Sequence, residues 1–97
     1  METVKLRKPL ADGKTELKLD FDKITGYILL KCEKEAKKDD PRITVPSLSQ
    51  AYNARVAAVA AGVKYDDILS LPAKDFSTTI NLVQNFLLDS EDASTSE

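Results

Sequence analysis

The chain has 97 residues, with 14 lysines and arginines against 16 aspartates and glutamates, so its formal net charge is −2. It has no histidine and a single cysteine, Cys32, which argues against zinc sites, internal disulfides and histidine-dependent hydrolysis. The length suits one domain, and a slightly acidic chain lacks the summed positive field that drives nucleic-acid binding.

Nothing in the sequence indicates export or membrane insertion. There is no signal peptide, and no apolar run approaches the roughly 20 residues that a membrane-spanning helix needs. A lone cysteine fits a reducing compartment. We therefore expect a cytoplasmic protein that does not bind membranes.

Residues 3–10 and 15–21 alternate apolar and charged side chains, which is the period-two pattern of β-strands. Between them, Asp12-Gly13 supplies the positive φ angles of a tight hairpin turn. We expect an antiparallel hairpin whose apolar face packs on the helices that follow, because a lone hairpin is marginally stable in water. Its open edge is a candidate site of self-association.

A first helix is predicted from Thr25, which can cap its N-terminus, to about Lys38. Its inward row consists of Ile28, Leu29, Cys32 and Ala36. Cys32 lies on this apolar row and is expected to be a small core residue and not a reactive thiol.

The segment Asp39-Asp40-Pro41-Arg42 ends this helix. A second helix is predicted to begin at Ser47, with Gln50 completing a capping box, and to stop at Gly62. One row of this alanine-rich helix consists of Leu48, Tyr52, Val56 and Val59. Two surroundings fit such a helix: close packing inside the domain, or an interface with a protomer or client.

A short helix over residues 66–71 opens with Asp66 and Asp67, which suit the positive end of a helix dipole. Pro72 then starts a longer amphipathic helix over residues 72–88. Its apolar side is formed by Phe76, Ile80, Leu82, Val83, Phe86 and Leu87. Asp75 is expected on the polar side.

After Leu88 the sequence DSEDASTSE has four acids and no large apolar side chain, so residues 89–97 are expected to form a disordered acidic tail. The predicted fold is α+β: an N-terminal β-hairpin, three main helices and one short helical turn, within a single domain spanning residues 1–88.

No residue pattern for catalysis, a cofactor or a metal is apparent. The paired acids, such as Asp66 and Asp67, match caps and turns, and no neighbouring motif would separate their pKa values as acid–base catalysis requires. Gly13, Gly26 and Gly62 are too scattered for a phosphate-binding loop. We therefore expect a non-enzymatic interaction protein.

The N-terminal KLRKPLADGKTELKLDF together with the phrases LSLPAKDF and LVQNFLL resembles the small tail assembly chaperones of long-tailed bacteriophages and prophages. The resemblance spans roughly residues 3 to 88. It implies a protein that works in several copies in the host cytoplasm, is absent from the finished virion, and coats the helical tape measure protein until tail tube subunits polymerise around it. It also implies a longer frameshifted form that recruits the tail tube protein.

Binding of amphipathic client helices requires apolar helix faces, and the candidate partner-binding residues on this ground are Tyr52, Val56, Phe86 and Leu87. The alternative is a small DNA-associated regulator, in which the second helix and those after Gly62 form a helix-turn-helix. Charge argues against it, because residues 72–88 offer few side chains for base edges and phosphates.

Overall fold

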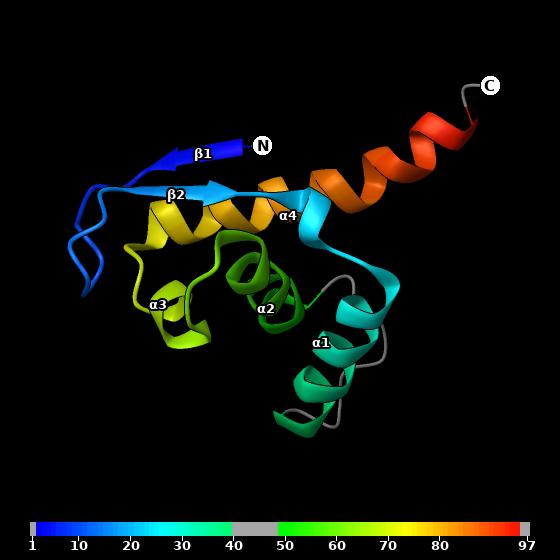
Figure 1. Ribbon diagram of the computed structural model, residues 1–97, viewed down its shortest axis with the longest axis horizontal. Helices are drawn as coiled ribbons and strands as arrows, with labels where there is room; N and C mark the ends of the chain where they lie inside the picture. The colour runs from blue at the N-terminus through cyan, green and yellow to red at the C-terminus, as the bar shows by residue number, and fades with distance from the viewer. Residues whose placement is uncertain (1, 40–48, 96–97) are drawn as a thin grey trace.

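The computed structural model describes residues 2–39 and 49–95, with side chains as far as Leu88. In chain order the elements are strands β1 (Glu2–Lys5) and β2 (Glu16–Leu19), the 3-10 helix η1 (Phe21–Lys23), and helices α1 (Gly26–Asp39), α2 (Gln50–Ala61), α3 (Tyr65–Leu69) and α4 (Ala73–Thr95). The predicted α+β fold, with its hairpin, three longer helices and one short helix, is confirmed (Figure 1).

The hairpin pairs β1 and β2 antiparallel, with Val4 opposite Leu17. Leu10 and Lys14 close a loop in which Gly13 adopts a φ of 90°, a conformation that glycine adopts without steric cost. Both strands are shorter than predicted. The backbone N–H of Arg7 points to the side away from β2 and donates to the Asp75 carboxylate of α4 at 2.8 Å.

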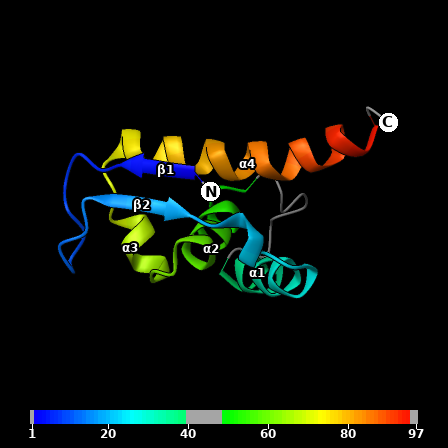
Figure 2. The ribbon, with the colours of Figure 1, turned by 45° about the horizontal axis from the view of Figure 1, so that its top comes forward.

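Helix α2 lies at the centre of the fold, with α1, α3, α4, β2 and η1 all packed against it. Figures 1 and 2 show the sheet, α3 and α1 around it. Its alanines Ala54, Ala57 and Ala60 are at most 1% exposed, and their small side chains let these elements approach closely. The alanine-rich helix is thus largely covered inside its own domain.

The helix ends follow local capping rules. Thr25 Oγ1 accepts the N–H of Ile28 at the start of α1, as predicted. Helix α2 ends at Gly62, whose φ is 69°, and the N–H of Val63 returns to the Ala58 carbonyl. The predicted start at Ser47 is wrong. Ser49 is the N-cap because its hydroxyl accepts the N–H of Tyr52, and Ser47 itself lies outside the described residues.

Helix α4 begins after Pro72 and continues to Thr95, beyond Leu88, where the sequence pattern placed the end of the domain. Its last turns project past the rest of the molecule (Figures 1 and 2). Residues 89–95 contain no glycine or proline, so an established helix can propagate through them. The backbone therefore differs here from the expectation of a disordered tail.

Candidate partner-binding surface

Two of the four predicted partner-binding residues lie in the core. Val56 is fully buried and Tyr52 is 7% exposed, because α2 is enclosed by its neighbours. Burial raises the pKa of the Tyr52 hydroxyl, with smaller contributions from Cys32 and Glu33. Val56 therefore offers no surface to a partner, and Tyr52 offers very little.

The other two residues lie nearer the surface, on α4. Phe86 is partly buried and stacks face to face on Phe21, with ring centroids 4.4 Å apart. Leu87 packs partly against the core, and the adjacent Leu88 is 57% exposed. The four predicted residues thus divide into a buried pair on α2 and a more peripheral pair on α4.

Helix α1 carries an exposed apolar pair that is not among the four predicted partner-binding residues. Tyr27 is 89% exposed and Leu30 is 66% exposed. The inward row of α1 is formed by Ile28, Leu29, Cys32 and Ala36. Tyr27 and Leu30 lie on the opposite side of the helix, at i and i+3, with Lys34 and Lys38 at i+7 and i+11. We call these four residues the α1 stripe: Tyr27, Leu30, Lys34 and Lys38.

The acidic side chains of α1 are engaged elsewhere. Glu33 pairs with Lys37 at 3.1 Å, whereas Glu35 and Asp39 both bind Arg55 of α2. Among the described residues, no ion pair involves Lys34 or Lys38. The α1 stripe is therefore apolar at its N-terminal half and, at its C-terminal half, carries two lysines without an ion-pair partner among the described residues.

Arg55 fixes the orientation of α1. Its guanidinium binds Glu35 at 2.7 Å and also binds Asp39, and it lies 4.0 Å from the ring centroid of Tyr65 on α3. This side chain, 15% exposed, joins three helices through two carboxylates and a cation–π contact. It was visible in the sequence only as the single charge within an apolar helix.

Cys32, Asp20 and Asp67 have roles in packing and helix capping. Cys32 is 4% exposed, which confirms the predicted core position, and burial raises the pKa of its thiol. Asp20 caps η1 by accepting the N–H of Asp22, and Asp67 accepts the N–H of Lys64. No group of metal-ligating side chains occurs within the described residues.

Within the described parts of the chain, no helix combines the length and apolar character that crossing a bilayer requires. Comparisons with protein-family models, with curated proteins and with solved structures found no match to this chain.

Proposed function

We propose that the protein is a phage tail assembly chaperone that binds the tape measure protein and keeps it soluble in the host cytoplasm during tail morphogenesis. The observation that carries this proposal is the α1 stripe. Tyr27 and Leu30 are exposed on a helix whose other side is held against α2, which is the arrangement by which a helix face receives an apolar partner.

The client helix that suits this stripe is amphipathic and acidic at one end. Its apolar residues would cover Tyr27 and Leu30, and its acids would approach Lys34 and Lys38. Leu88 and the partly buried Phe86 and Leu87 give α4 a second apolar stretch. A long helical client could use both surfaces, or a second copy of the chain could cover one of them, and light scattering across a concentration series measures such self-association.

The test is coexpression with a tape measure fragment that is insoluble on its own. A Tyr27→Ala/Leu30→Ala variant should lower the soluble fraction strongly, because each buried aromatic or leucine anchor at an interface contributes on the order of 1–2 kcal/mol. The matched control is Leu69→Ala, which removes a leucine that is 49% exposed on α3. Circular dichroism first establishes that all variants are folded.

If the double variant protects the fragment as well as the parent does, the stripe is not the client surface. If neither the parent nor any variant protects a fragment, the chaperone proposal itself fails. The alternative DNA-associated regulator is tested by a gel shift at low and high salt, in which salt-sensitive retardation by the parent would favour it.

A further inference from the structure

A groove of about 430 Å³ follows the edge of β2 that is not paired with β1. Figures 1 and 2 show β2 between β1 and α2. The groove is bounded by the stretch from Lys14 to Asp20 and, across from it, by Ala60, Ala61 and Val63 at the end of α2. It shares no residue with the α1 stripe.

The β2 edge presents unpaired backbone groups to this groove. In an antiparallel pair, successive residues direct their N–H and C=O groups to alternate sides. Leu6 donates to the Thr15 carbonyl, so Thr15 and Leu17 face β1, whereas Glu16 and Lys18 face the other way. The direction is verified at Asp20, whose N–H donates to the Ala60 carbonyl of α2 at 2.9 Å. No other segment of the described chain bonds to the outward groups of Glu16 and Lys18.

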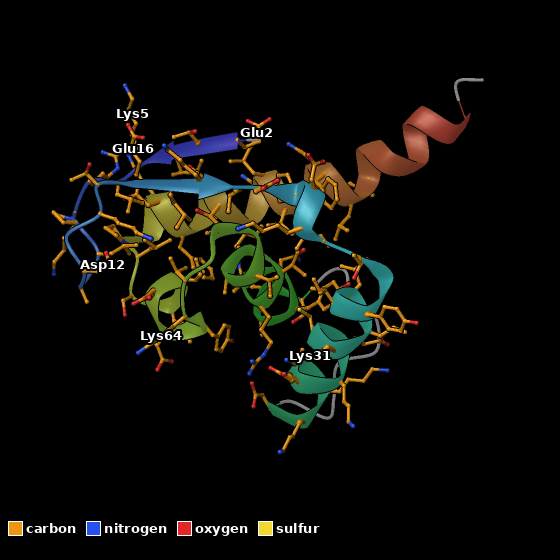
Figure 3. The ribbon with its side chains drawn as sticks, in the orientation of Figure 1. Glu2, Lys5, Asp12, Glu16, Lys31 and Lys64 are labelled. Atoms are coloured by element: carbon orange, nitrogen blue, oxygen red, sulfur yellow. The ribbon has the colours of Figure 1, made fainter. Side chains whose placement is uncertain are left out.

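Three charged side chains that line the groove, Glu16, Lys18 and Lys23, form no ion pair among the described residues. Glu16 lies opposite Lys5 in the hairpin register, and Figure 3 shows both on the outer face of the sheet, pointing away from the helices. The Asp20 carboxylate is engaged with the N–H of Asp22. Lys18 follows Glu16 by two residues and lies on the same outer face, so the two lysines exceed the single glutamate by one positive charge.

Lys23 also lines the groove. Its Nζ lies 3.9 Å from the position that a Cβ on Gly62 would occupy, so its charge sits at the C-terminal end of α2, where the helix dipole favours a cation. The other wall is formed by the small side chains of Ala60 and Ala61. The small side chains of this wall leave space for a peptide backbone that carries small side chains.

We propose that this groove binds an extended segment of a partner protein, in which small apolar residues alternate with acidic ones, as an added strand on β2. The segment's backbone bonds to Glu16 and Lys18, its small side chains face Ala61 and Val63, and its acids lie beside Lys18 and Lys23. Main-chain hydrogen bonds supply the affinity of such strand addition, and the alternate side chains supply its selectivity. This site is separate from the client surface on α1 and does not depend on the proposed function.

The experiment uses the full chain and a fluorescent, capped peptide of about seven residues in which valine and glutamate alternate, close to the length of one strand. Fluorescence anisotropy measures its affinity. The variant Lys18→Pro removes an N–H that points into the groove, and proline is tolerated on a strand edge where no ladder bond is lost. We expect at least about a tenfold loss of affinity.

The matched control is Thr3→Pro, because Thr3 lies directly opposite Lys18 and directs its own N–H to the outer edge of β1. It should leave the peptide affinity unchanged. Should Lys18→Pro fail to fold, Ala61→Phe fills the groove without altering the strand and should abolish binding. Lys23→Gln should weaken binding several-fold, whereas Lys31→Gln on α1, outside the groove, should not.

Three results would overturn the proposal. The first is peptide binding that survives both Lys18→Pro and Ala61→Phe, or that is lost in Thr3→Pro alone. The second is equal affinity for a peptide with lysine in place of glutamate, since the lysines would then have no role. The third is a concentration-dependent dimer of the parent that Lys18→Pro dissolves, which would assign the edge to a second copy of the chain.

Discussion

Asp75 holds the N-terminal segment on α4, and its replacement by alanine is the most informative test of the fold. The residue is 5% exposed. Its carboxylate accepts the backbone N–H of Arg7 at 2.8 Å and lies 3.6 Å from the Arg7 Nε. The interaction joins positions 68 residues apart in the chain, so it closes the hairpin onto the last helix.

The expected cost can be divided among three contributions. A hydrogen bond to a charged acceptor contributes about 1.5–3 kcal/mol, and its loss leaves a partly buried N–H without a partner. The ion pair with the Arg7 side chain adds little, about 0–1 kcal/mol, because that side chain is 64% exposed. An acid in the first turn of α4 contributes about 0.3–1 kcal/mol through the helix dipole. We therefore expect Asp75→Ala to lower the free energy of unfolding by about 2–5 kcal/mol.

Urea denaturation followed by circular dichroism measures this cost, and two variants separate its contributions. Asp66→Ala removes an exposed acid from the first turn of α3, so it reports the dipole share and should cost at most about 1 kcal/mol. Arg7→Ala keeps the backbone N–H and should also cost at most about 1 kcal/mol. If Arg7→Ala costs as much as Asp75→Ala, the side-chain ion pair and not the backbone bond holds the segment, and the reasoning is refuted.

Three further outcomes are expected. Arg55→Ala should lower the unfolding free energy by about 2–3 kcal/mol, since Glu35 and Asp39 lose a charged partner. Arg55→Lys should restore little of this loss, because an ammonium cannot span both carboxylates and stack on Tyr65. Full restoration by lysine in a urea titration would contradict this. The raised pKa of Cys32 favours the protonated thiol in the folded protein. The stability that this thiol contributes is therefore complete below the ordinary thiol pKa and is lost as pH rises through the pKa of the folded state. Cys32→Ala should flatten the alkaline decline of the urea midpoint, and an unchanged decline would refute this coupling of thiol ionisation to stability. Removal of residues 89–97 should shift the unfolding free energy by less than about 1 kcal/mol, because the segment has no large apolar side chain, and calorimetry showing a larger loss would mean that it is docked.

Sequence pattern alone determined the elements that depend on neighbouring residues. The alternation around Gly13 predicts the hairpin, Thr25 predicts the start of α1, and Gly62 predicts the end of α2, because turns and caps are made by backbone and side-chain groups only a few residues apart. The apolar rows of α1 and α4 likewise predicted the burial of Cys32 and Val83. Each of these features can be read within one or two helical turns.

The functional surface could not be read in this way. An apolar helix row has the same appearance whether it faces its own core or a partner, so Tyr52 and Val56 were candidates for binding until the packing of five other elements around α2 enclosed them. Conversely, Tyr27 and Leu30 stay exposed because nothing among the described residues packs on the outer side of α1.

Long-range polar contacts were also beyond the sequence. Asp75 had the spacing of a polar surface position, yet it is buried because its partner is the backbone of Arg7, far away in the chain. Arg55 likewise meets Asp39 and Tyr65 only after α1, α2 and α3 have packed together. Local geometry specifies helices, strands and their ends, whereas the side of each helix that remains at the surface is decided by which other elements dock on it, and that choice belongs to the tertiary structure.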